Sequence, residues 1–305
     1  MINIVFLGTP KIALKSLEYL YNSDKVNVQA LVTQPDKPAG RGNKISMSPL
    51  KEFALTHNIP IYQPKSIRKS PETIDELKKL QPDFFVTFAF GQILSQEVLD
   101  IPKYATVNLH ASLLPKYRGA NPIQRAIING DKETGICTMI TELELDCGDV
   151  CKKEIIQILP DTTCVDLFEE IGEKSPKIIE ETLTGLVAHT ITPQKQCKDG
   201  VCFANKLSKE ETKIDWTKSA CSIHNLVRGI YKFPGAYFIK NDKIIKVMET
   251  RIAQGHGNAG ELIKADKNGV EIACGEGSII LVKVKPEGKN EMLARDWYNG
   301  IKNKG

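Results

Sequence analysis

Two polar side chains stand close together near the middle of the chain, in the stretch NLHASLLPKYRG at residues 108–119. Asn108 and His110 follow the apolar, β-branched run 105–107, which indicates the end of a buried strand. Residues two apart on an extended backbone point to the same face, so an amide donor and an imidazole should lie side by side. Such a pair suits a reaction in which a carbonyl oxygen becomes negative and an amine loses a proton. The alternative is a polar strand end with a structural histidine.

Two neighbouring segments could complete such a site. Ser112, Leu113, Leu114 and Pro115 turn the chain, and the proline restricts that turn. The second segment is LDCGD at residues 145–149, which places the carboxylate of Asp146 on a tight loop. If the loop approached His110, the carboxylate would orient the imidazole and stabilise its charged form. Aspartates are also common in surface turns, so both possibilities stay open.

The elements that must position these groups begin at the N-terminus. The pattern predicts a strand over 2–7, an amphipathic helix over 12–20 and a second strand over 26–33. This βαβ order predicts a parallel, doubly wound α/β sheet. The first turn holds one glycine, Gly8, rather than GxGxxG, which argues against a dinucleotide site.

Later apolar runs continue this sheet. We expect helices over 48–57, 74–80 and 163–188 and one starting at Pro122, with strands over 61–62, 83–88, 135–142 and 150–158, the last two added antiparallel. Phe88, Phe90 and Ile93 lie at or after the strand that ends at 88, where α/β sheets bind ligands. They could wall an apolar slot, and a core role fits them equally well.

The segment QPDKPAGRGNKI at residues 34–45 combines two prolines, two glycines, Lys37, Arg41 and Lys44. We expect a long, mobile loop here, and flexible cationic loops suit phosphate backbones. A disordered surface loop without function is the alternative.

From Leu207 the pattern changes to one helix, short strands and a last helix. The expected helices cover 219–231 and 292–298, and the expected strands cover 236–240, 244–252, 260–265, 270–273 and 279–284. Short strands with turns between them predict a small β-barrel. Residues 207–305 carry 17 Lys and Arg against 12 Asp and Glu, whereas residues 1–206 carry 24 against 25. The basic part could face a polyanion, although ordinary solvated lysines explain it as well.

Composition narrows the class of protein. The 305 residues are 41% hydrophobic, enough for a sizeable core, and no apolar run reaches the roughly 18 residues of a membrane span. Met1 leads directly into a strand without a basic leader, so we expect a cytoplasmic protein that does not bind membranes. Eight cysteines without a CxxC pair predict reduced thiols and no metal site.

Several motifs occur together in one order: GTP at 8–10, TQPDKPAGRG at 33–42, NLHASLLPKYRGANPIQRAI at 108–127, LDCGD at 145–149 and LSKEETKIDW at 207–216. Along essentially the whole chain they resemble the folate-dependent formyltransferases, and specifically the branch that formylates methionyl-tRNA. The N-x-H and SLLPxxRG motifs are typical of the fold, and the PAGRG and KIDW segments of the tRNA branch.

The resemblance implies a Rossmann-like formyltransferase domain over 1–188, a linker over 189–206 and an OB-like β-barrel over 207–305 that binds tRNA. It implies transfer of a formyl group from 10-formyltetrahydrofolate to the α-amine of initiator methionyl-tRNA, without a metal and by a monomer. Matched by motif, the catalytic residues are Asn108, His110 and Asp146. Ser112, Leu113, Leu114 and Pro115, with Phe88, Phe90 and Ile93, would contact folate, and Arg41, Lys37 and Lys44 would contact tRNA.

Four positions depart from the family pattern. Phe90 stands where tyrosine is usual, Gln92 where a small aliphatic residue is usual, Glu144 replaces a glycine and Cys147 a threonine. The departures at Phe90 and Gln92 affect the polarity of the expected folate pocket. Those at Glu144 and Cys147 affect the backbone shape of the loop that carries Asp146. Rival functions are formylation of a sugar nucleotide, hydrolysis of 10-formyltetrahydrofolate, and tRNA binding without catalysis. The basic loop argues against the first two, and the intact catalytic residues argue against the third.

Overall fold

The computed structural model describes residues 1–39 and 44–302, with backbone alone for 38–39 and 44–45. The chain divides into two compact units. The first comprises residues 1–119, 134–156 and 168–203, and the second comprises residues 120–133, 157–167 and 204–305. Two segments inside the stretch 1–188 therefore belong to the second unit.

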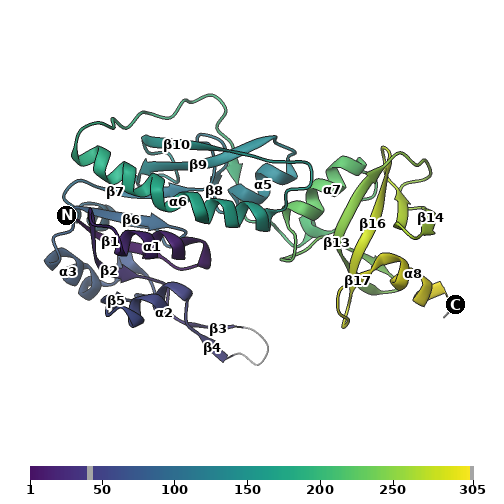
Figure 1. The fold of residues 1–305 in the computed structure, drawn as a ribbon, viewed down its shortest axis with the longest axis horizontal. Coiled ribbons are helices and arrows are strands. Elements are labelled where there is room, and N and C mark those ends of the chain that lie inside the picture. The colour runs from purple at the N-terminus through teal and green to yellow at the C-terminus, as the bar shows by residue number, and fades with distance from the viewer. Residues whose placement is uncertain (40–43, 303–305) are drawn as a thin grey trace. The chain divides into compact units, whose positions relative to one another are not determined.

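The first unit is built on a seven-stranded sheet (Figure 1) with the order β10-β9-β7-β6-β1-β2-β5. Its strands are β1 (Ile2–Gly8), β2 (Val26–Val32), β5 (Ile61–Tyr62), β6 (Phe84–Phe88), β7 (Ala105–His110), β9 (Glu133–Ile140) and β10 (Val150–Gln157). The neighbours from β5 to β7 pair parallel, whereas β9 pairs antiparallel to β7. The expected doubly wound α/β fold is confirmed.

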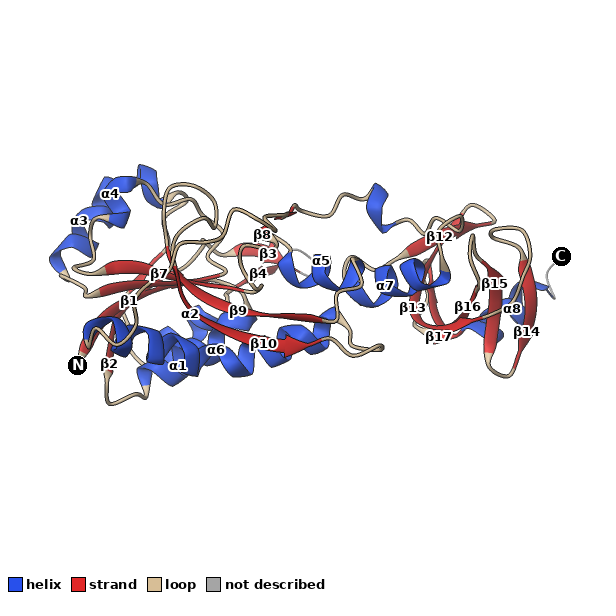
Figure 2. Ribbon diagram, turned by 90° about the horizontal axis from the view of Figure 1, so that it is seen from above, coloured by secondary structure: helices blue, strands red, loops and turns tan. Residues whose placement is uncertain are grey.

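Helices cover both faces of this sheet. They are α1 (Leu14–Tyr21), α2 (Pro49–Thr56), α3 (Pro71–Lys79), α4 (Gln96–Leu99) and α6 (Cys164–Val187), with short 3₁₀ helices at Lys11–Ala13 and Ile67–Lys69. Figure 2 shows α1 and α6 on one side of the sheet and α3 and α4 on the other. Ile4 and Val5 point to opposite faces of β1 and are both fully buried, as expected for a strand covered on both sides.

Parts of the basic segment 34–45 form strands. Residues Lys37–Ala39 form β3 and Lys44–Ser46 form β4, which pair antiparallel as a hairpin (Figure 1). The expectation of a long, mobile loop was therefore wrong for residues 37–39 and 44–45, whose backbone groups pair with each other. Residues 40–43 of the same segment lie outside the described residues. The two-residue strands β8 (Arg118–Gly119) and β11 (Phe203–Ala204) pair with each other, and β11 lies in the stretch expected to be a linker.

The second unit combines helices with an antiparallel sheet of order β12-β13-β16-β15-β14, to which β17 adds beside β16. Its elements are α5 (Pro122–Ile128), a 3₁₀ helix (Glu210–Thr212), α7 (Ala220–Gly229), β12 (Tyr237–Lys240), β13 (Lys243–Ala253), β14 (Leu262–Asp266), β15 (Gly269–Ala273), β16 (Ser278–Pro286), β17 (Met292–Leu293) and α8 (Ala294–Lys302). The helix expected to start at Met292 starts two residues later, since Met292 and Leu293 pair with β16. Phe238, between the rings of Trp216 and Trp297, lies in the core.

Candidate active site

The end of β7 carries the two residues from which the sequence predicted the chemistry. Asn108 lies in register with Thr87 on β6 and with Met139 on β9. The Thr87 hydroxyl donates to Asn108 Oδ1 at 2.8 Å. An amide oxygen held by a donor leaves the amide nitrogen as the end of the side chain that can donate. Asn108 is thus oriented as a hydrogen-bond donor at the strand end.

His110 is almost fully buried, with 7% of its side chain exposed. Its Nε2 atom lies 2.8 Å from the carbonyl oxygen of Tyr117. A carbonyl oxygen can only accept, so Nε2 carries the hydrogen and donates it. The other ring nitrogen, Nδ1, faces Oδ2 of Asp146 at 3.6 Å. A proton taken up at Nδ1 would lie between the ring and this carboxylate.

Asp146 reaches this position from the loop between β9 and β10. Its Oδ2 atom accepts a hydrogen bond from the backbone N–H of Gly119 at 2.8 Å, and 13% of its side chain is exposed. The φ angle of Asp146 is +49°, in the left-handed region that side chains other than glycine rarely adopt. The structure therefore brings together the three residues predicted to be catalytic, from positions 38 residues apart along the chain.

The turn after β7 is held from inside the protein. The Ser112 hydroxyl is fully buried and donates to the carbonyl oxygen of Lys116 at 2.6 Å. Leu114 packs in a small apolar cluster with Cys137, and its carbonyl oxygen accepts from the Lys153 ammonium group. Leu113 and Pro115 are half-buried. The turn is thus stiffened by contacts beneath it.

The apolar residues predicted for the folate slot lie in different environments. Phe90 is 4% exposed and packs in the core with α3 and α4, and Phe88 is 2% exposed. Ile93 is 67% exposed. Gln92 accepts from the backbone N–H of Ile67 and donates to the carbonyl oxygen of Pro64. This departure from the family pattern therefore serves a structural role.

Two of the residues predicted for tRNA contact, Lys37 and Lys44, lie on β3 and β4. Lys37 donates to the side chain of Gln34, whose amide donates to the carbonyl oxygen of Phe90 at 3.0 Å. Lys44 starts β4, where only the backbone is described. Arg41 lies outside the described residues.

The thiol of Cys147 follows the aspartate directly. Burial and the nearby carboxylate of Glu142 raise the pKa of this thiol to about 11. At neutral pH it is therefore a neutral thiol rather than a thiolate nucleophile. In residues 1–39 and 44–302 no group of three or more His, Cys, Asp and Glu side chains could hold a metal ion. Within the same ranges, no helix is long and apolar enough to cross a membrane.

The sequence analysis missed the partners that hold the site. Thr87 is a buried strand residue without a motif, and Gln196 lies in the stretch expected to be an irregular linker. The amide of Gln196 donates to the backbone of the Asp146 loop. Neither contact has a sequence signal, because each joins residues that only the fold brings together.

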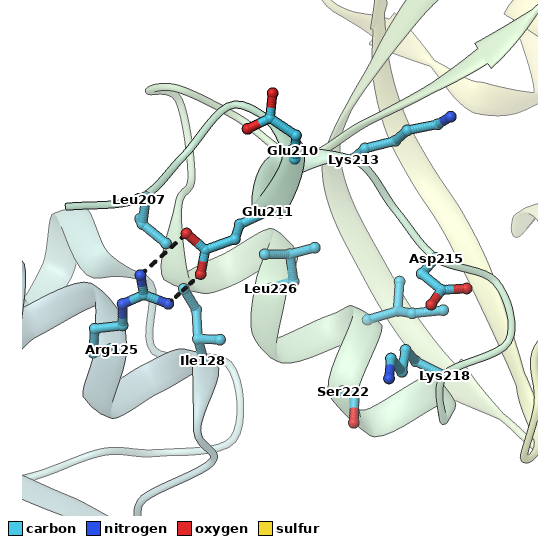
Figure 3. Close-up of a pocket in the computed structure, with 11 residues that line it drawn as sticks. Arg125, Ile128, Leu207, Glu210, Glu211, Lys213, Asp215, Lys218, Ser222 and Leu226 are labelled. Atoms are coloured by element: carbon cyan, nitrogen blue, oxygen red, sulfur yellow. Dashed lines mark hydrogen bonds and ion pairs between the residues drawn. The ribbon is translucent and has the colours of Figure 1, made fainter. Parts of the chain in front are cut away.

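A cavity of about 300 Å³ lies within the second unit (Figure 3). It is bordered by α5, the 3₁₀ helix at 210–212 and α7, and Arg125 pairs with both carboxylate oxygens of Glu211 on its wall. Basic and acidic side chains alternate around it, and none of the three predicted catalytic residues lines it.

Comparison with known proteins gives consistent results. Residues 2–183 match the formyl transferase family, and residues 206–302 match the formyl transferase C-terminal domain. A methionyl-tRNA formyltransferase of Clostridium perfringens is 44% identical over 97% of this chain and 96% of its own length.

Solved structures share the fold. A methionyl-tRNA formyltransferase from Clostridium thermocellum has a TM-score of 0.59 and 17% identity, covering 84% of this chain and 96% of its own. A sugar 3N-formyl transferase solved in the presence of dTDP and 5-N-formyl-THF has a TM-score of 0.67 and 22% identity, covering 95% of this chain and 99% of its own.

Proposed function

The chain belongs to the methionyl-tRNA formyltransferase family, and from this premise we propose that it transfers the formyl group of 10-formyltetrahydrofolate to the α-amine of initiator methionyl-tRNA. The product, N-formylmethionyl-tRNA, serves translation initiation in the cytoplasm. The observation that carries the proposal is the convergence of Asn108, His110 and Asp146 at the end of β7.

The reaction needs an oxyanion stabiliser. The α-amine attacks the formyl carbon, a C–N bond forms, and the formyl oxygen becomes negative. The Asn108 amide nitrogen, oriented by Thr87, donates to that oxygen. The loss of one such donor typically lowers the rate by about 10²–10³.

The reaction also needs a path for one proton. Protonated His110 helps to neutralise the oxyanion, and Asp146 holds the ring at Nδ1. Asp146 accepts the proton of the attacking amine through a water. When the intermediate collapses, the oxyanion re-forms the carbonyl, the bond between the formyl carbon and N10 of the folate breaks, and N10 takes up, through water, the proton that Asp146 had accepted. One proton thus moves from the amine to the leaving nitrogen, and the charges balance.

We assign the substrates to different segments. Folate, as a co-substrate, contacts the turn Ser112–Pro115, whose buried hydroxyl and leucine hold its shape. The segment 34–45, with Lys37, Arg41 and Lys44, contacts the tRNA acceptor end, since arginine both grips phosphate and stacks on bases. The segment 207–305 adds phosphate contacts, with 17 basic against 12 acidic residues. We propose 1–188 as the catalytic domain, 189–206 as the linker, and a monomer as the active form.

A formylation assay tests the proposal. Purified protein is mixed with charged initiator tRNA, with 10-formyltetrahydrofolate present or omitted, and formylmethionine is measured after deacylation. Formylation that requires both substrates, and is lost in Asn108→Ala, supports the proposal. Formylation of an amino-sugar nucleotide instead, or release of formate without an acceptor, would replace it with one of the rival functions.

A further inference from the structure

One side chain outside the predicted motifs makes four hydrogen bonds at the candidate active site. Gln196 Nε2 donates to the carbonyl oxygens of Asp146 and Gly148, each at 2.8 Å. Its Oε1 accepts from Arg118 Nε at 3.1 Å and Arg118 Nη2 at 2.8 Å. An amide has two N–H donors and two lone pairs on its oxygen, so all four are used.

These bonds join the two segments that hold the aspartate. Arg118 directly precedes Gly119, whose backbone N–H donates to the Asp146 carboxylate. Gln196 thus links the backbone of Asp146 to the segment that grips its side chain. If the Gln196 bonds were lost, the loop and Gly119 would be free to move apart, and the carboxylate would move relative to His110.

The loop needs such support because its conformation is unusual. Asp146 has a left-handed backbone, a conformation that persists where surrounding contacts enforce it. Gly148 packs so closely on β9 that an added Cβ would lie 1.9 Å from the carbonyl oxygen of Ile140. The loop is therefore tightly fitted on one side by β9, and Gln196 binds its carbonyl groups.

The stretch around Gln196 is itself fixed to the first unit. Gln194 and Val150 exchange two backbone hydrogen bonds, at 2.8 and 2.9 Å. Further along, the carbonyl oxygen of Cys202 accepts from the backbone N–H of Arg118 at 2.9 Å, and its sulfur accepts from that of Tyr117. We call residues 194–202 the strap. Both ends of the strap are anchored, so the Gln196 side chain is held in a defined place.

We propose that Gln196 is a positioning residue for Asp146, which it holds at the distance and orientation that His110 requires. The inference rests on the proposed function, because its readout includes formyl transfer. Gln196 itself touches neither His110 nor the reacting atoms and acts through the loop.

The chain offers a matched control. Gln194 is the same residue type on the same strap, but its side chain is exposed and its hydrogen bonds with Val150 are made by the backbone. We would compare Gln196→Leu, which removes all four bonds, with Gln194→Leu. Gln196→Glu is a third variant, which keeps the acceptor for Arg118 but replaces the donors to the two carbonyl groups.

Three measurements on the full-length protein test the inference: kcat and KM for charged tRNA, the pH profile of kcat, and hydrogen exchange at the Gly119 amide. In Gln196→Leu we expect kcat to fall at least tenfold, with the KM for charged tRNA within about twofold and an altered pH profile. Exchange at Gly119 should speed up at least tenfold. Gln196→Glu should resemble Gln196→Leu, and Gln194→Leu should match the wild type in all three measurements.

Each other outcome overturns the inference. If Gln196→Leu matches Gln194→Leu in kcat and in Gly119 exchange, Gln196 does not position the loop. If activity falls only in proportion to the unfolded fraction, seen by thermal unfolding, with an unchanged pH profile, the role is structural alone. Failure of the proposed function is separate, since the wild type would then not formylate methionyl-tRNA, and Gly119 exchange would still report on the loop.

Discussion

His110 lies between two oxygen atoms, one from a backbone carbonyl and one from a carboxylate. Its Nε2 donates to the Tyr117 carbonyl oxygen at 2.8 Å, and its Nδ1 faces Asp146 Oδ2 at 3.6 Å. The carbonyl fixes the tautomer and the plane of the ring. The carboxylate faces the nitrogen that would gain a proton. Nε2 therefore sets the orientation of the ring, and Nδ1 is the atom that would bind a proton. Substitution of Asp146 affects the second role and leaves the first in place.

His110→Ala should lower kcat at least tenfold and leave folate affinity within about twofold. The imidazole acts mainly on the transition state, so the chemical step should suffer more than binding. Steady-state formylation and a folate titration measure the two effects. The exposed His256→Ala is the control. A variant that keeps more than about a tenth of kcat would show that His110 is not an oxyanion partner, since such groups are usually worth more.

Asp146→Asn should lower kcat about as much as His110→Ala does. Asp146 Oδ2 both accepts from the Gly119 N–H and faces Nδ1 of His110, so an amide oxygen in that place keeps the Gly119 bond but brings no negative charge to the ring. The pH dependence of kcat should change as well as its maximum value. A variant with the wild-type profile would argue against coupling between the two side chains.

Arg41→Ala should impair formylation of charged tRNA and spare folate binding, because the folate turn lies at Ser112–Pro115. The measurement is kcat/KM for charged initiator tRNA, with folate affinity measured alongside. Arg68→Ala, an exposed arginine of the first unit, is the matched control. In the wild type, tRNA affinity should fall as salt rises, since lysine and arginine contacts release counterions. Equal losses for tRNA and for a minimal amine acceptor would contradict the tRNA role of Arg41.

Glu180→Gln should destabilise the protein at neutral pH, by about 1–3 kcal/mol as for other hydrogen bonds to charged groups. Burial opposes the charge of Glu180, yet hydrogen bonds from Ser23 and Lys25 outweigh it and lower the pKa of the carboxyl below its usual value of 4.5. A lowered folded-state pKa stabilises above pH 4.5, and this stability is lost as the pH falls through the folded-state value.

Urea unfolding at pH 7 and near pH 3 measures this effect. The difference between wild type and Glu180→Gln should shrink at the lower pH. Glu169→Gln, an exposed residue on the same helix α6, should show little difference at either pH. If the difference in free energy of unfolding between the wild type and Glu180→Gln were the same at pH 3 as at pH 7, the effect would not come from the charge of Glu180.

Cys147 should react with iodoacetamide at pH 7.5 at least tenfold more slowly than Cys197, measured by mass spectrometry of the labelled peptides. The thiolate is the reactive form, and burial beside Glu142 raises the pKa of Cys147 to about 11. Cys197 is exposed. Raising the pH toward 10 should increase labelling of Cys147 steeply. Equal rates at pH 7.5 would contradict the raised pKa.

The sequence by itself determined the α/β fold and the identity of the chemical groups. Hydrophobic periodicity and the βαβ order predicted the sheet, because a strand buried on both faces requires continuous apolar residues. The spacing of Asn108 and His110 placed them on one face, since the period of a strand is two. Asp146, by contrast, depended on a resemblance to other proteins, because no local pattern tells a catalytic turn aspartate from an ordinary one.

Tertiary structure decided how these groups are held. The Tyr117 carbonyl, the Thr87 hydroxyl and the Gln196 amide each bind a predicted residue from a distant part of the chain or across a turn. Residues 34–45 were expected to be a long, mobile loop, yet β3 and β4 in this region pair antiparallel, and Phe90 packs in the core. Such contacts depend on which groups come together once the sheet has formed. The residues involved are distributed along the chain, so a short motif does not predict them.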